Sequence, residues 1–196
     1  MSDEGPLPTS TPLELAKFVF RALDNGDGAG VAAATHPSTL SSYQQRVLSV
    51  MGGHLVLRRQ RPDVGQAPSG GVQLDLANLD LLELRDERVV NIPGVTSFGQ
   101  LLTLDAAELL ERLIRGQWEF FDPTITDPVS SFEVGENVVV DGESADVPYR
   151  RVRHYASGDI DTRQHVLSAR LEGSRWLLWS MTQAVIWWSL FLPIET

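Results

Sequence analysis

Apolar residues near the start of the chain recur every three or four positions, the period of an amphipathic helix. The first apolar stripe consists of Leu15, Val19 and Leu23. Thr11 precedes it as a favoured N-cap residue, and Glu14 stands three residues later, so the two form a capping box. Asn25 and Gly26 supply a helix stop. The pattern predicts a helix that begins after Thr11 and ends before Gly26.

Three further helices are predicted. Small residues over 27–35 indicate a short helix, a periodic stripe over 38–51 indicates a longer one, and residues 105–115 form a third, capped by Asp105. Glycine pairs are typical helix ends, so Gly52–Gly53 closes the helix over 38–51 and Gly116 closes the last. Residues 54–57 fit either a strand or a helix continuation, residues 61–71 form a loop, and residues 73–84 have no clear period.

After Trp118 the spacing of apolar residues changes to two, which is typical of strands. It predicts strands over 129–140, 143–155, 163–172 and 175–186, separated by glycine-containing turns. Helices followed by a strand meander predict an α+β fold, with N-terminal helices packed on one face of a curved antiparallel sheet of about four strands.

Four segments carry a resemblance to a known family. These are Leu23-Asp24-Asn25-Gly26-Asp27, Thr35-His36-Pro37, Ser144-Ala145-Asp146-Val147-Pro148-Tyr149-Arg150 and Leu171-Glu172-Gly173-Ser174-Arg175-Trp176-Leu177-Leu178. In this order they resemble the nuclear transport factor 2-like superfamily, which includes ketosteroid isomerase-like and polyketide cyclase-like proteins. The resemblance covers residues 11–51 and 129–186. It implies a cone in which the sheet wraps the first helix and leaves a pocket at the open end.

The residues and the resemblance together predict a domain division. Residues 1–10 form an irregular arm, residues 11–186 a single domain with an insertion at about 54–104, and residues 187–196 an apolar tail. Members of the superfamily include isomerases, cyclases, dehydratases, hydrolases and non-catalytic binding proteins. The shared motifs are structural, so the fold does not assign an activity.

Composition narrows the chemistry. The chain has 196 residues, no cysteine and a formal net charge of −10, which excludes disulfides and thiolate sites and disfavours nucleic acid as a partner. No group of histidines and carboxylates has metal-ligand spacing, so neither a metal nor another cofactor is predicted. The start lacks a signal-peptide pattern, and the apolar run over 184–194 is too short for a membrane span. We expect an acidic cytoplasmic protein.

Strand pairing predicts a ligand site. In the last hairpin, Leu171 faces Trp176. For the preceding hairpin, one register sets Arg153 opposite His165 and a competing one sets His154 there, and a slip by one residue would turn every side chain over. The first register places the apolar residues of the two hairpins together on one face of the sheet. It also places a polar set, which would suit a carboxylate or other anionic group, at the open end of one face. The predicted ligand-binding residues are Tyr149, Arg151, Arg153 and His165, with Thr182 beside them.

A structural alternative remains open for that set. The arginines could pair with acidic residues on the helices, and His165 could be an ordinary strand residue. On the competing register, His154 and His165 could form a metal pair, but no third ligand is placed by spacing. Asp63 and Asp146 are candidate general bases if buried.

The opposite sheet face and the tail are unexpectedly apolar. Val152, Val166, Leu177, Trp179 and Met181 point to that face on the preferred register. A solvated face should be polar, so the insertion or another chain is expected to cover it. Aromatic residues are enriched at binding hot spots. The predicted partner-binding residues are Trp179, Met181, Trp187, Trp188 and Phe191. The alternative is that the tail folds back onto its own domain.

Two function hypotheses follow. The first is a non-catalytic binding or assembly module that docks to a protein partner or a second copy and holds a small apolar ligand. The second is a cofactor-free isomerase, cyclase or dehydratase, with His165 as the base and Arg151 and Arg153 as electrostatic stabilisers. An open cavity of roughly 300 Å3 containing an acid or base favours the enzyme, whereas a cone filled by aromatic side chains favours the module.

Overall fold

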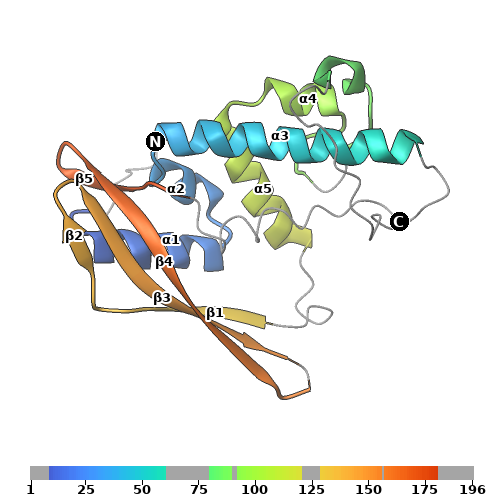
Figure 1. Ribbon diagram of the computed structural model, residues 1–196. Coiled ribbons are helices and arrows are strands. Elements are labelled where there is room, and N and C mark those ends of the chain that lie inside the picture. Colours follow the sequence, from blue (N-terminus) through green and yellow to red (C-terminus); the bar gives the residue numbers. More distant parts are fainter. Residues whose placement is uncertain (1–8, 61–79, 90–91, 121–128, 156, 181–196) are drawn as a thin grey trace, which may run out of the picture.

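The computed structural model describes residues 9–60, 80–89, 92–120, 129–155 and 157–180, with the side chains of residues 57–60, 117–120 and 129–130 excepted. Helices occupy the N-terminal part and strands the C-terminal part (Figure 1). The predicted α+β fold is therefore confirmed. The helices are α1 (Pro12–Asp24), α2 (Gly28–Ala33), α3 (Pro37–Gln60), the 3-10 turn η2 (Leu81–Leu84), α4 (Phe98–Thr103) and α5 (Ala106–Phe120). The strands are β1 (Val129–Val134), β2 (Val139–Asp141), β3 (Ser144–His154), β4 (Ile160–Glu172) and β5 (Arg175–Leu178).

Helix α1 begins and ends as predicted. The Thr11 hydroxyl accepts a hydrogen bond from the Glu14 amide at 3.2 Å, and the Glu14 carboxylate accepts one from the Thr11 amide at 3.1 Å. Asn25 caps the C-terminus, and Gly26 follows with a φ of 67°. Because both signals are local, the sequence alone was sufficient to place this helix.

Helix α3 corrects the predicted stop at Gly52–Gly53. It runs through both glycines to Gln60, so residues 54–57 continue the helix, which is one of the two predicted alternatives. A Cβ at Gly52 would lie 2.6 Å from the Leu81 side chain, so glycine here permits η2 to pack closely against α3. This tertiary contact outweighs the helix-breaking tendency of the pair.

Two more helical features differ from expectation. Helix α5 starts after Asp105, whose carboxylate accepts a hydrogen bond from the Glu108 amide at 2.8 Å, as predicted. It continues through Gly116 to Phe120, so Gly116 is not its end. Helix α4 was not predicted, although its cap is visible in the sequence: Ser97 is the N-cap and its hydroxyl accepts from the Gln100 amide.

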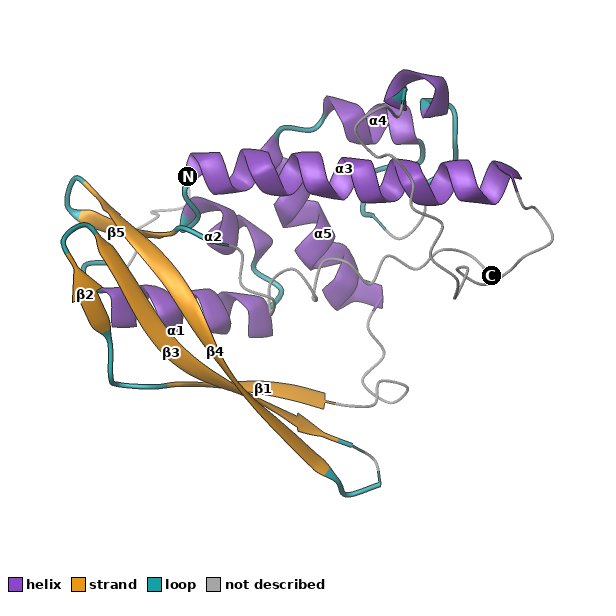
Figure 2. Cartoon of the chain, in the orientation of Figure 1, coloured by secondary structure: helices purple, strands orange, loops and turns teal. Residues whose placement is uncertain are grey.

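The sheet is antiparallel and strongly curled (Figure 2). Its strand order is β1-β3-β4-β5, and β2 also pairs with β3, so the predicted strand over 129–140 is split into β1 and β2. The outer edge of β5 is occupied. The Trp176 amide donates to the Thr9 carbonyl at 2.9 Å, and the Leu178 amide donates to the Ala34 carbonyl at 2.8 Å. Covering this edge removes a row of unpaired backbone groups.

Both predicted registers of the β3–β4 hairpin are wrong. Tyr149 pairs with His165 and Arg153 with Asp161, because the turn at Gly158 is tight and β4 already begins at Ile160. The shift from the preferred register is an even number of residues, so the division of side chains between the two faces is retained. The predicted pairing of Leu171 with Trp176 in the β4–β5 hairpin is confirmed.

Helix α1 packs against the concave face of the sheet and fills its narrow end. Fully buried residues from both layers meet there, including Leu15, Val19, Val147, Leu167 and Leu178. Helix α2 joins this layer to α5, and α3 packs on α5 in turn. Within the described ranges, no helix is long and apolar enough to cross a membrane.

Candidate functional site

The concave face of the sheet carries three successive rows of side chains. From the narrow end outward, the rows are Val134–Tyr149–His165 and Phe132–Arg151–Arg163, which cross β1, β3 and β4, and Arg153–Asp161, which crosses β3 and β4. The structure thus brings the four predicted ligand residues Tyr149, Arg151, Arg153 and His165 to one face. The same pairing adds Arg163 and Asp161, which the sequence analysis missed.

Aromatic rings fill the space between α1 and the first two rows. The Phe20 ring on α1 lies 4.7 Å from the ring of Phe132 and 4.7 Å from that of Tyr149, measured between centroids. The Tyr149 ring in turn stacks on His165 at 5.3 Å. Phe20 and Tyr149 are buried, so the cone is packed with side chains at this level. Contacts of this kind are stabilising beyond their buried area.

Beyond the aromatic rings, the concave face becomes cationic. Three arginines, Arg151, Arg153 and Arg163, share it with one carboxylate, Asp161, among the described strand residues. Arg163 Nε donates to Asp161 Oδ2 at 3.1 Å, and the Arg163 side chain is 62% exposed. Arg151 lies directly opposite Arg163, and like charges in that position repel.

Arg151 is the least satisfied of these residues. It is only 7% exposed, and its Nε is buried without a hydrogen-bond partner among the described residues. Burial, and then repulsion from Arg153 and Arg163, lowers the pKa of Arg151. A buried donor without an acceptor costs folding free energy, about 1–3 kcal/mol in general and more for a charged group.

His165 borders the same cationic region. Its Nε2 is also buried without a hydrogen-bond partner in the described part of the chain. Burial first, and then the charges of Arg151, Arg163 and Arg153, lowers the pKa of His165, so the ring is neutral at pH 7. Two buried nitrogen atoms without hydrogen-bond partners, Arg151 Nε and His165 Nε2, therefore lie in a region with an excess of positive charge.

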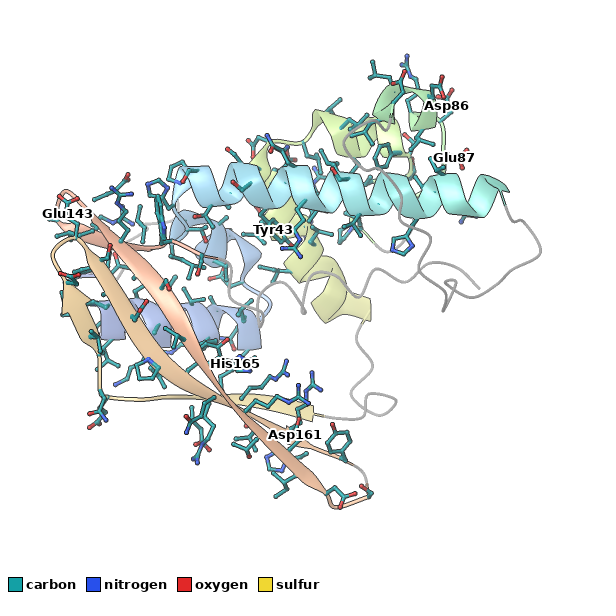
Figure 3. All side chains as sticks on the ribbon, in the orientation of Figure 1. Tyr43, Asp86, Glu87, Glu143, Asp161 and His165 are labelled. Atoms are coloured by element: carbon teal, nitrogen blue, oxygen red, sulfur yellow. The ribbon has the colours of Figure 1, made fainter. Side chains whose placement is uncertain are left out.

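The cationic residues lie along the β3–β4 ribbon, beyond the row that contains His165. The β3–β4 ribbon continues past the helix toward a free tip (Figure 1). Figure 3 places His165 near the middle of the ribbon and Asp161 closer to the tip. The first two rows contact α1 through Phe20, and the third row lies farther along the ribbon toward its tip. Thr182 lies outside the described residues.

Only one predicted partner-binding residue lies in the described ranges. Trp179 is 39% exposed on the convex side, the Arg170 guanidinium lies 4.6 Å from its ring centroid, and His36 packs edge-on against it. Met181, Trp187, Trp188 and Phe191 lie outside the described residues.

The convex face is more mixed than predicted. Val166 is 52% exposed, but Val152 is buried. The Arg150–Glu133 ion pair lies on the same face. Of the predicted apolar residues described on this face, Val166 and Trp179 are therefore exposed and Leu177 is half-buried. Val139 and Ile160, which were not predicted, add exposed apolar side chains to the same face.

A hollow lies between the first part of α3 and Trp179, the residue that follows β5. It has a volume of about 330 Å3 and is lined by residues of α3, including Thr39, Tyr43 and Arg46, and by Trp179. The Thr39 hydroxyl already donates to the Trp179 carbonyl, so part of the polar lining is satisfied within the chain. This hollow therefore indicates a ligand less strongly than Arg151 Nε and His165 Nε2, which are buried without hydrogen-bond partners among the described residues.

The remaining candidates from the sequence can also be placed. Asp146 is exposed and accepts a hydrogen bond from the Ser168 hydroxyl at 2.9 Å, which does not suit a buried base; Asp63 lies outside the described residues. His154 pairs with Ile160 and faces away from His165, so the two cannot share a metal on this register. Among the described residues, no cluster of three potential metal ligands occurs.

A scan of the chain against protein-family models and a search of curated proteins each find no match. The fold defines an α+β protein with a curled antiparallel sheet, and the residues of its concave face define a cationic candidate site.

Proposed function

We propose that this protein is a non-catalytic binding module, of nuclear transport factor 2-like fold, that holds a small molecule on the concave face of its sheet. The observation that carries this proposal is the buried Arg151, whose Nε has no acceptor among the described residues. Proteins rarely leave such a donor unsatisfied in the core. A ligand that supplies the acceptor explains why the residue is tolerated there.

Binding is favoured over catalysis by the surroundings of the rows. Phe20, Phe132 and Tyr149 pack the cone at its centre, so side chains and not an enclosed chamber occupy that level. General acid–base chemistry needs a proton acceptor and donor with matched pKa values. His165 has no carboxylate hydrogen-bonded to it among the described residues, so no acid–base pair supports catalysis.

A protein partner is the second part of the proposal. Trp179 presents an exposed indole beneath the Arg170 guanidinium, and tryptophan and arginine are the residues most enriched at interface hot spots. This surface lies on the convex side, so a partner could bind there while the concave face holds a ligand.

One observation favours an enzyme as the alternative. His165 is neutral at pH 7, has an unsatisfied Nε2 and lies next to three arginines. This combination suits proton abstraction from a carbon acid, with the guanidinium groups stabilising the resulting oxyanion. The alternative predicts that a bound molecule is converted, whereas the binding module returns it unchanged.

Native mass spectrometry of the full chain, purified gently from its own source, tests the proposal. We expect the folded protein to retain a small molecule that has the same mass after incubation at 25 °C as before. Time-dependent conversion of that molecule would support the enzyme. A protein that carries no small molecule in any preparation would contradict the binding function.

A further inference from the structure

We propose that the group recognised on the concave face is a carboxylate joined to a flat apolar ring, and that Arg151 binds it. This inference rests on the proposed binding function and names the chemical class of its ligand. The site lies in the middle row, where Phe132, Arg151 and Arg163 stand side by side on three neighbouring strands.

The need for a negative group follows from the charges of the rows. Three guanidinium groups share the face with the single carboxylate of Asp161 among the described strand residues, and that carboxylate is bound to Arg163. Arg151 is therefore a buried cation whose Nε has no hydrogen-bond partner among the described residues and whose nearest described counter-charge, Asp161, is already bound by Arg163. A buried charge is stable only when it is paired, and in an acidic protein an anionic ligand must be attracted by such a local cluster.

A carboxylate fits these donors better than a phosphate. Guanidinium is planar, and its parallel N–H groups match the two oxygens of a carboxylate. Phosphate sites usually add free backbone N–H groups from a helix N-terminus or a glycine-rich loop. Here the backbone N–H groups around Arg151 belong to a central strand that is paired on both sides, by β1 and by β4. The doubly charged phosphate would also lose more hydration beside the aromatic rings.

The neighbours of Arg151 indicate the rest of the ligand. Phe132 is directly opposite on β1 and half-buried, and the His165 ring is diagonal to it on β4 and half-buried as well. A flat ring attached to the carboxylate can therefore contact apolar and aromatic faces on either side of the guanidinium. Aromatic contacts of this type favour offset-stacked or edge-to-face geometry.

Isothermal titration calorimetry of the full chain at pH 7 and low salt tests the inference. The probes are sodium benzoate, its neutral isostere benzamide, and phenyl phosphate. We expect benzoate to bind at least about tenfold more tightly than benzamide, because a charge-assisted hydrogen bond is roughly twice as strong as a neutral one. Benzoate should also bind more tightly than phenyl phosphate.

Three variants assign the binding to Arg151. Arg151→Met should weaken benzoate binding at least about tenfold, and Arg151→Lys, which keeps the charge but loses the planar fork, should weaken it several-fold. The matched control is Arg150→Met, one residue earlier on the same strand but facing the other side of the sheet. It should leave benzoate affinity within about twofold of the unaltered chain, since it touches none of the rows.

Two results would contradict the proposed ligand class but would leave the proposed binding function standing. Tighter binding of phenyl phosphate than of benzoate, lost in Arg151→Met, would make the ligand a phosphate. Equal binding of benzoate and benzamide, unchanged in Arg151→Met, would remove the anion site. Failure of the binding function is a separate outcome, seen as the absence of any retained small molecule in native mass spectrometry.

Discussion

Replacing Arg151 by methionine should stabilise the ligand-free protein while removing its ligand site. In the folded chain, Arg151 is 7% exposed, its Nε lacks an acceptor among the described residues, and Arg163 stands directly opposite. Methionine keeps an unbranched, flexible stem of similar reach and carries no charge or N–H group. The variant therefore removes an unfavourable group and keeps most of the packing.

The size of the effect follows from the same contacts. An unsatisfied buried donor costs about 1–3 kcal/mol, and the like-charge neighbour adds to that cost. Loss of favourable contacts made by the guanidinium head offsets part of the gain. We expect a net stabilisation of about 1 kcal/mol, which corresponds to a rise in Tm of about 2–4 °C for a domain of this size.

Thermal unfolding followed by circular dichroism at pH 7 and low salt, with urea unfolding as a second probe, measures this change. Arg150→Met is the matched control, because Arg150 neighbours Arg151 on β3 but points to the convex face, where it pairs with Glu133. Both partners of that pair have side chains that are 53% exposed. Exposed ion pairs contribute little, so the control should change stability by less than about 0.5 kcal/mol.

The opposite result would refute the reasoning. If Arg151→Met lowers the free energy of unfolding by more than about 1 kcal/mol, the guanidinium is already paired within the folded chain. The positive charge on the concave face would then be balanced within the folded chain. The main evidence for an anion site on that face would be gone.

Three further predictions concern the core, the helical packing and pH. Leu167→Ala should lower the free energy of unfolding by about 2–5 kcal/mol in urea titrations, because Leu167 is 0% exposed between α1 and the sheet. Gly28→Ala should destabilise the protein despite alanine's better helix propensity, since the new Cβ would lie 2.5 Å from the Glu111 carbonyl oxygen in α5. Burial and its arginine neighbours lower the pKa of His165 in the folded state, so the unfolded chain binds more protons and stability should fall as pH drops below about 6.5.

Each of these has a matched comparison. Val166→Ala, on the exposed side of the same strand as Leu167, should cost less than about 1 kcal/mol; an equal cost would contradict the assignment of faces. A gain in stability for Gly28→Ala would mean that α2 and α5 do not approach so closely. His165→Gln should reduce the loss of stability below pH 6.5; an unchanged loss in that variant would contradict the assignment to His165.

Local sequence signals predicted where most helices lie, but not where α3 and α5 end. The capping box of Thr11 and the Asn25–Gly26 stop act within one turn of the chain, so α1 could be placed from sequence. The continuation of α3 through Gly52 depends on a contact with Leu81, almost thirty residues away in the chain, which no local pattern contains. Tertiary packing decided the outcome there.

The candidate site also could be predicted only in part from local sequence signals. Alternation along β3 and β4 placed Arg151, Arg153 and His165 on one face, because a side chain's face depends only on parity. The register depended on the turn near Gly158, whose geometry the sequence left open. The predicted strand over 163–172 already contained Arg163 on the same face as His165, but the wrong register set it opposite Tyr155 and away from Arg151. Asp161 was missed because it lies before the predicted start of that strand.

The contribution of Phe20 was not visible in the sequence. It lies beside the apolar stripe of α1, so the sequence predicts an ordinary core residue. In the structure, its ring packs against Phe132 and Tyr149 and helps to fill the cone. Only the distance between the helix and the sheet shows that the central space is packed.

Mapping benzoate binding by two-dimensional NMR of the full chain tests the central claim most directly. A titration that shifts the backbone amides of residues 149–153 and 161–165, together with the Nε–H resonance of Arg151, would agree with a ligand site on the concave face. Shifts confined to the start of α3 and to Trp179 would place the ligand in the hollow beside α3. That result, or no shift at any concentration, would contradict the account.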